Sequence, residues 1–368
     1  MSGRRRNLSR GFAVKPVSWH IPSYTSVNEE QAEILAKPRT NFIPVEVHPP
    51  FDEDCPASLY NFIRGVTEIQ TRLLRTTNAS PTVAYEIRRS SPDNLVFQFV
   101  VPSKRLERKL RTNLQAEIPA ISFSKGVNGL PITAEDSIGG GTNLQAEIPA
   151  ISFSKGVNGL PITAEDSIGG GLLTPGLSDY QPFHTEFRSP PINAITGTLH
   201  PHAMRDTRFV VQVLFQPVIG EPVRQWWWRR RARKHSKYLR GDKETLTGSR
   251  APSPRERRQA NMIDEKVGNR RFWTSIRFLV IGAGDYTISR EKELAGAFNL
   301  YENPVNGQYL GLYKLRSFRQ KPFLEFTHAV CDRRFAGYSL KFQTSIDELA
   351  AFTSIPDRRQ QNIRYAQP

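Results

Sequence analysis

The order of apolar and polar positions divides the first part of the chain into short strands and two helices. Four runs rich in β-branched and aromatic side chains predict strands. These runs are residues 42–48, 82–88, 95–101 and 208–216. Between the first two runs, an apolar stripe at helical spacing predicts a helix from Pro56 to about Thr76. Its members are Leu59, Phe62, Ile63, Val66, Ile69 and Leu73. Ser103 is expected to cap a second helix, with Leu106, Leu110 and Leu114 on one face.

The last hundred residues show the same kind of alternation. Residues 272–281 (FWTSIRFLVI) predict a strand, a helix follows from about Ser289, and residues 309–315 return as a strand. Two further helices are expected at 323–332 and 345–352, the second with a serine cap. The β-α-β order of 272–315 suits a split unit of the ferredoxin-like kind.

These elements predict an α+β protein with two small domains, each a mostly antiparallel sheet with helices on one face. Residues 1–40 are polar and irregular and are expected to form a flexible N-terminal arm. The first domain would span 41–220 and the second 271–368. Residues 221–270 change sharply in composition, and we interpret them as a basic connector between the domains.

An exact tandem repeat interrupts the first domain. Residues 112–141 recur without one change at 142–171. The start of the first copy continues the helix before it, and the end of the second copy runs into the segment after it. The surplus length therefore belongs to neither copy alone. Deleting 112–141 or 142–171 gives the same product, and we expect that product to fold at least as well as the full chain. We interpret the glycine runs 139–141 and 169–171 as linker.

Charge and cysteine content narrow the class of protein. Lys and Arg total 51 against 35 Asp and Glu, which gives a formal net charge of +16. Such a balance favours anionic partners, either nucleic acid or an anionic membrane face. The alternative is a basic surface without a specific partner. Two cysteines, no apolar run of membrane-spanning length and no secretory signal favour the reducing cytosol. A peripheral place at the inner face of the membrane remains compatible with this.

The sequence offers little catalytic chemistry. Gly282-Ala283-Gly284 stands between a strand and a helix like a dinucleotide-binding turn, but Thr287 occupies the place of the third glycine. The glycine runs lack the Lys-Ser/Thr of a P-loop, so we expect no ATP hydrolysis by this chain. His184, His200 and His202 have no further ligand at metal-binding spacing. We therefore predict a chain that is not an enzyme and uses neither a cofactor nor a metal.

The strongest binding candidate is a run of tryptophans followed by basic residues. Its members are Trp226, Trp227, Trp228, Arg229, Arg230, Arg231, Arg233 and Lys234. Aromatic rings beside cations can hold nucleic acid through stacking and phosphate contacts. The same pattern occurs at membrane surfaces, where tryptophan lies at headgroup depth. A third alternative is a connector helix whose tryptophans pack onto a domain.

Three stretches resemble the region upstream of the motor in conjugative, type IV secretion-like ATPases of the HerA–FtsK superfamily, archaeal type. The first is 179–218, in which Gln212 and Pro217 match a strand that ends in Gln-x-x-x-x-Pro. The second is FWTSIRFLV at 272–280 with the helix that contains ELAGAFNLYENP. The third is TSIDELAAFTSIPD at 344–357, which is similar to a stretch just before the motor.

The resemblance implies a non-catalytic accessory module of a conjugation-type DNA-transfer ATPase. The exact duplication, together with the missing motor, indicates relaxed constraint, as expected on a mobile genetic element. Walker A, Walker B and arginine-finger motifs are missing from this sequence, so the motor would be encoded separately or be lost. The expected partners are a HerA–FtsK-type motor or other secretion subunits, with DNA, an anionic membrane surface and self-association as further possibilities. The alternative function is a stand-alone nucleic-acid-binding protein that uses residues 226–240.

Overall fold

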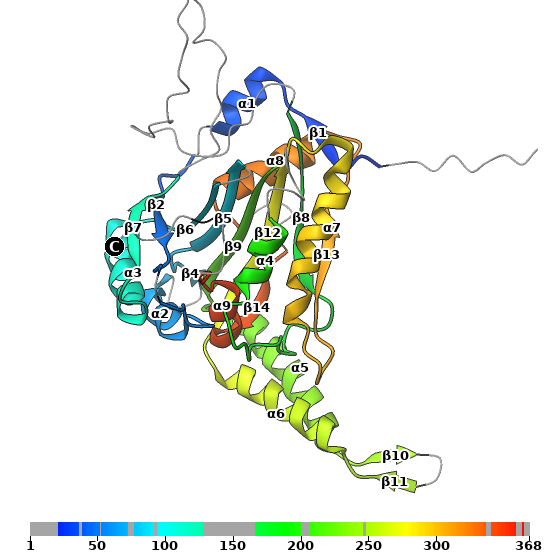
Figure 1. The fold of residues 1–368 in the computed structure, drawn as a ribbon. Coiled ribbons are helices and arrows are strands. Elements are labelled where there is room, and N and C mark those ends of the chain that lie inside the picture. Colours follow the sequence, from blue (N-terminus) through cyan, green and yellow to red (C-terminus); the bar gives the residue numbers. More distant parts are fainter. Residues whose placement is uncertain are drawn as a thin grey trace, which may run out of the picture.

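A computed structural model describes residues 21–36, 39–51, 53–72, 77–91, 94–127, 166–199, 207–245, 248–335, 340–357 and 363. Ten strands form one antiparallel sheet in the order β1-β8-β12-β9-β5-β6-β2-β7, with β13 also paired to β8 and β14 to β12 (Figure 1). The strands are β1 (Tyr24–Ser26), β2 (Ile43–His48), β5 (Val83–Ser91), β6 (Asn94–Val101), β7 (Ser122–Lys125), β8 (Ser167–Pro175), β9 (Arg208–Pro217), β12 (Arg271–Ile281), β13 (Leu310–Lys314) and β14 (Phe342–Ser345). The α+β class and the mostly antiparallel pairing are confirmed.

The expectation of two separate sheets is wrong. Strand β12 comes from the expected second domain, yet it lies between β8 and β9 of the expected first domain. All eleven residues of β12 are buried, so this strand needs neighbours on both edges and helices on both faces. Such neighbours are far away in sequence, and no local pattern identifies them.

The split β-α-β unit is present within this larger sheet. Strand β12 leads through the 3-10 turn Gly284–Tyr286 into α7 (Thr287–Ala297), then through a second 3-10 turn, Phe298–Tyr301, to β13. Both β12 and β13 pair with β8 in the antiparallel sense, on its opposite edges. The two strands are therefore parallel to each other with β8 between them, which is the split arrangement that the β-α-β order suggested. Strand β8 itself was not predicted.

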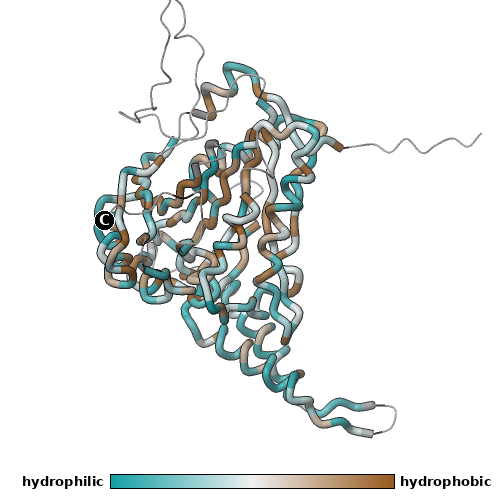
Figure 2. The backbone as a smooth tube through the Cα atoms, viewed as in Figure 1, coloured by the Kyte–Doolittle hydropathy of each residue, from teal (hydrophilic) through white to brown (hydrophobic). Residues whose placement is uncertain are grey.

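Helices cover both faces of the sheet rather than the one face expected. The main core contains side chains of α2 (Tyr60–Val66), α3 (Lys104–Glu117), α4 (Ile192–Thr198), α7 and α9 (Ile346–Phe352). A second core on the other face contains side chains of α1 (Glu29–Ala36) and α8 (Lys321–Cys331). Along β12, Phe278 and Val280 enter the main core whereas Leu279 and Ile281 enter the second, as the alternation of a strand requires. Figure 2 shows the apolar residues gathered along these central strands.

The N-terminal segment departs from its predicted irregular state. Residues 1–20 lie outside the described residues, but β1 pairs with β8 and α1 follows it. Val27, Ala32 and Leu35 are each only 1% exposed in the second core. Polar residues elsewhere in α1 hide this stripe, which is why composition alone suggested a flexible arm.

The helix predicted for 56–76 is shorter than its apolar stripe. Helix α2 ends at Val66, and Thr67 turns to extended backbone. Residues beyond it form the two-residue strands β3 (Thr71–Arg72) and β4 (Thr77–Asn78), which pair with each other. Gln70 and Ser80 close this small hairpin, since the Gln70 N–H donates to the Ser80 hydroxyl at 3.0 Å.

The two copies of the repeat contribute different pieces of the fold. The first copy supplies the end of α3 and all of β7, and the second supplies the start of β8. Residues 128–165 between them, with the glycine run 139–141, lie outside the described residues. The linker interpretation is wrong for Gly169–Gly171, which lie inside β8. A Cβ atom on Gly170 would lie 2.5 Å from the Phe278 carbonyl oxygen, so glycine permits this close approach of two backbones.

Candidate interaction surface on a basic helical arm

Residues 221–268 form a projecting unit, here called the arm. Helix α5 (Pro222–Arg240) runs outward, strands β10 (Lys243–Thr245) and β11 (Gly248–Arg250) pair at the tip, and α6 (Pro254–Gly268) returns along α5 (Figure 1). Ala232 and Leu239 of α5 pack against Ala260 and Ile263 of α6. Ser253 and Glu256 form a capping box that starts α6. The expected connector is thus a helical hairpin with a β-tip.

The place of the arm in the sheet corrects its expected role as a link between domains. Strands β9 and β12 are antiparallel neighbours, and Pro217 at the end of β9 pairs with Phe272 at the start of β12. A tight turn of a few residues can join two such strands. The 48 residues of the arm are therefore an insertion in a strand-to-strand connection and not a requirement of the topology.

Trp228 fastens the root of the arm to the body. Its indole N–H donates to the Asp179 carboxylate at 2.7 Å, and the other Asp179 oxygen accepts from the Gln343 backbone at 3.0 Å. The Arg271 guanidinium lies 4.2 Å from the centre of the Trp228 ring. Burial and the nearby Arg229 lower the pKa of Arg271 to about 10, with Asp179 acting in the opposite direction.

A buried ion pair fastens the other helix of the arm. The Lys266 ammonium lies 2.7 Å from the Glu348 carboxylate at the start of α9, and both side chains are almost fully buried. Glu348 also accepts the backbone N–H groups of Ser345 at 2.6 Å and Phe183 at 2.7 Å. Such a fully bonded pair fixes the direction in which α6 leaves the body.

The face of α5 that points away from α6 combines exposed rings with cations. Trp226 is 52% exposed, Trp227 55% and Tyr238 64%. The Arg230 guanidinium lies 5.2 Å from the Trp226 ring centre and 6.0 Å from that of Trp227. At 3.6 residues per turn, Lys234 follows Arg230 on the same face, so the cations stand between the rings.

The arm holds a large share of the charge of the protein. It carries fourteen Lys and Arg against six Asp and Glu, a balance of +8 out of the +16 of the whole chain. Three of its six acidic residues pair with cations of the arm itself: Glu221 at the root, Glu256 near the tip, and Asp264, which lies 2.5 Å from Arg240. Among the described residues, no carboxylate lies within ion-pair distance of the five exposed cations Arg229, Arg230, Arg231, Arg233 and Lys234. These cations are therefore available to an external anion.

The structure separates the eight residues singled out from the sequence. Seven are exposed on α5, while Trp228 is half-buried and acts as an anchor. The sequence left open that the tryptophans pack onto a domain. Of the three tryptophans, only Trp228 does so. The small residues Ala232 and Ser236, one and two turns later, mark the buried side of α5 and could have identified Trp228.

The other candidates from the sequence gain no site. In the Gly282–Gly284 turn, both glycine N–H groups donate to Ser167. The Gly282 N–H bonds the Ser167 backbone oxygen at 2.8 Å, and the Gly284 N–H bonds the Ser167 hydroxyl at 2.7 Å. These donors are thus engaged and do not form an open phosphate cradle. Within the described part of the chain, no cluster of His, Cys, Asp or Glu has metal-binding geometry. His200 and His202 lie outside the described residues. Among the described residues, no helix is long and apolar enough to cross a membrane.

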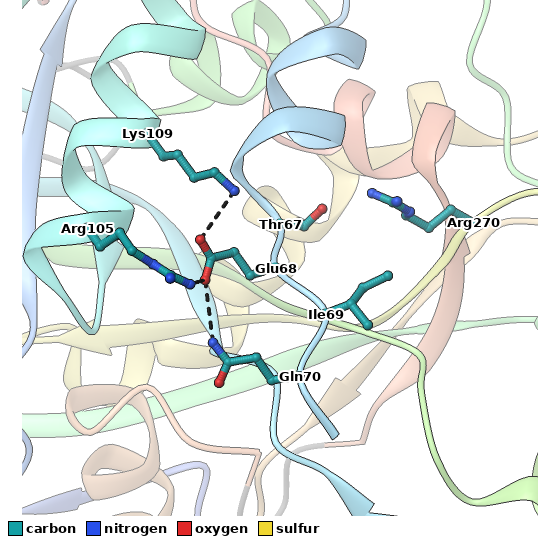
Figure 3. Close-up of a pocket in the computed structure, with 7 residues that line it drawn as sticks. All are labelled: Thr67, Glu68, Ile69, Gln70, Arg105, Lys109 and Arg270. Atoms are coloured by element: carbon teal, nitrogen blue, oxygen red, sulfur yellow. Dashed lines mark hydrogen bonds and ion pairs between the residues drawn. The ribbon is translucent and has the colours of Figure 1, made fainter. Parts of the chain in front are cut away.

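A small open pocket of about 580 Å³ lies beside the root of the arm (Figure 3). Glu68 binds Arg105, and it also pairs with Lys109 at 3.2 Å, while Arg270 lines the opposite side. Burial would raise the pKa of Glu68, but these two cations lower it overall. Because the carboxylate already occupies Arg105 and Lys109, the pocket is a weaker candidate than the arm.

Sequence reasoning missed a buried polar row that crosses the sheet. Gln98, Glu86, Gln212 and Arg277 are paired in register on β6, β5, β9 and β12. Gln212 donates to Glu86 at 2.7 Å and accepts from Arg277 at 2.6 Å. Burial would raise the pKa of Glu86, but Arg333 and Arg88 lower it to about 2. Gln212, a landmark of the resemblance, thus has a structural role in this row.

Comparison with known proteins assigns the chain to a family. The model of Domain of unknown function (DUF8128) matches residues 18–147 and 141–368. The two matches overlap at residues 141–147, at the boundary between the two copies of the repeat. No curated protein matches the sequence. From these matches, which span most of its length, the chain belongs to the DUF8128 family.

Proposed function

We propose that this protein binds nucleic acid through the exposed face of α5. The observation that supports this most is the arm itself, a 48-residue insertion between two paired strands that carries half of the net charge. An insertion that the topology does not need is a common place for a binding function. Phosphates are the anions that such a dense, unpaired set of arginines suits best.

The distribution of side chains on α5 favours nucleic acid over a lipid surface. A helix that lies in a membrane interface buries a continuous apolar face and keeps its cations on the polar side. On α5, Arg230 and Lys234 lie on the same face as Trp226 and Trp227. Insertion of the rings into lipid would bury these cations as well, whereas a nucleic acid can contact rings and cations together.

The test compares salt dependence of binding in two variants with equal loss of charge. Replacing Arg229, Arg230, Arg231 and Arg233 by alanine should weaken binding to an oligonucleotide and reduce the slope of log K against log salt by about 3 to 4. The control replaces four exposed cations outside the arm, namely Lys104, Arg108, Lys292 and Arg319. The control should retain the wild-type slope, and equal behaviour of the two variants would contradict the proposal.

The resemblance to the pre-motor region of HerA–FtsK ATPases supports a second, compatible role. In that role the body docks a separately encoded motor while the arm contacts the transferred DNA, in the cytosol or at the inner face of the membrane. The two matching strands β9 and β12 are the pair from which the arm emerges, so the resemblance covers the base of the arm. Co-purification with such a motor from native extract is the test, and its absence would count against the docking role but not against nucleic-acid binding.

A further inference from the structure

We infer that the arm binds single-stranded nucleic acid, with bases stacked on Trp226 and Trp227 and phosphates held by the cations between the rings. This inference rests on the proposed function and names its substrate class. The rings are the feature that decides it, because phosphate contacts alone do not distinguish one strand from two.

The geometry of the tryptophan pair suits two separate bases. The ring centres are 5.0 Å apart and the ring planes meet at 78°. A base cannot lie between rings at this angle, so each ring offers an outer face of its own. Both rings are more than half exposed, and α6 packs on the opposite side of α5. In a duplex the base faces are covered by neighbouring base pairs, so the rings would gain stacking only if the duplex opened.

The length of the exposed face matches a short strand. Tyr238 lies twelve residues after Trp226, about 18 Å along the helix at ~1.5 Å per residue. At the ~3.4 Å per nucleotide of a stacked strand, that distance corresponds to about five nucleotides. Arg230 and Lys234 fall between the rings at intervals of one turn. Rings at both ends with cations between them form a linear site in which bases and phosphates are contacted together.

The experiment removes bases and rings independently. Fluorescence anisotropy would measure binding of the full chain to a 15-nucleotide oligothymidine, a 15-nucleotide abasic strand and a 15-base-pair duplex. We expect W226A/W227A to lose roughly 10-fold or more for oligothymidine, because stacking contributes strongly at each base. Its binding to the abasic strand and to the duplex should stay within about 2-fold of wild type. W226F/W227F, which keeps aromatic faces, should recover most of the lost affinity.

The outcomes separate this inference from the proposed function. If W226A/W227A weakens oligothymidine, abasic strand and duplex equally, single-strand stacking is wrong while nucleic-acid binding stands. If the four-arginine variant also binds all three like wild type, the proposed function itself fails. Binding confined to vesicles containing phosphatidylserine, with loss in W226A/W227A, would overturn both in favour of a membrane surface. Unchanged circular dichroism of each variant checks that α5 still folds, as its exposed positions lead us to expect.

Discussion

At the scale of single residues, Gly170 lies in β8 at a point where the backbone of β12 approaches closely. An alanine there would place its Cβ 2.5 Å from the Phe278 carbonyl oxygen and 2.7 Å from the Phe326 ring. We expect Gly170→Ala to lower the free energy of unfolding by about 2 kcal/mol or more, since backbone as well as side chain must move. Urea unfolding measures this loss. Gly268→Ala at the end of α6, where an added Cβ would meet nothing within 4 Å, is the control and should not be destabilised.

Glu291 gives a prediction of pH dependence at the same scale. Burial raises its pKa to about 8, and Lys314 and Arg316 lower it only in part. The folded protein then keeps this proton up to about pH 8, whereas the unfolded chain releases it near the ordinary value of 4.5. The free energy of unfolding is therefore not reduced by Glu291 below pH 4.5, and it falls as the pH rises from 4.5 to 8.

Glu291→Gln should remove that loss. We expect no change in the free energy of unfolding at pH 4 and a gain on the order of 3 kcal/mol at pH 8 and above. Glu293→Gln, an exposed change on the same helix, is the control and should show no pH-dependent gain. A Glu291→Gln variant with the same stability as wild type at both pH values would show that the carboxyl is solvated.

At the scale of elements, the attachment of α5 depends on one tryptophan of three. Trp228→Phe removes the N–H that binds Asp179 and reduces the contact with Arg271, so we expect a loss of about 1 to 2 kcal/mol in stability. Trp227→Phe makes the same chemical change at an exposed neighbour and should stay within about 0.5 kcal/mol of wild type. Thermal unfolding measures both, and equal effects would show that Trp228 does not anchor the arm.

The same helix shows what a sequence can predict about an element. The helical character of α5 and its cationic surface follow from composition, and seven of eight candidate residues are exposed as a binding surface requires. The pairing of α5 with α6 was not predicted, because it depends on contacts between residues more than twenty positions apart, such as Ser236 and Ala260. The β10–β11 tip pairs residues only three to seven positions apart and was missed as well. Similarly, the strands around 83–101 and 208–216 were predicted from their apolar runs, but nothing local showed that β12 would separate β8 from β9.

At the scale of the whole molecule, the buried polar row and the two cores explain why the predicted domain boundary does not hold. Arg277 of β12 bonds Gln212 of β9, and Arg333 beyond α8 bonds Glu86 of β5 at 2.9 Å. These bonds join residues on both sides of position 220 inside one buried layer. Separating the halves would leave buried charges without partners, which is strongly destabilising. We therefore interpret the body as one cooperative unit from which the arm projects.

The tandem repeat tests this interpretation at the same scale. Deleting either copy gives one product, in which 8 residues instead of 38 connect Val127 of the first copy to Asp166 of the second. All described elements keep their sequence, because α3 and β7 use the first copy and β8 uses the second. Shortening this connection from 38 to 8 residues lowers the entropic cost of closing the loop by about 1 kcal/mol. We expect a single cooperative urea transition at equal or slightly higher midpoint, and loss of cooperativity would mean that the additional 30 residues contribute to the fold.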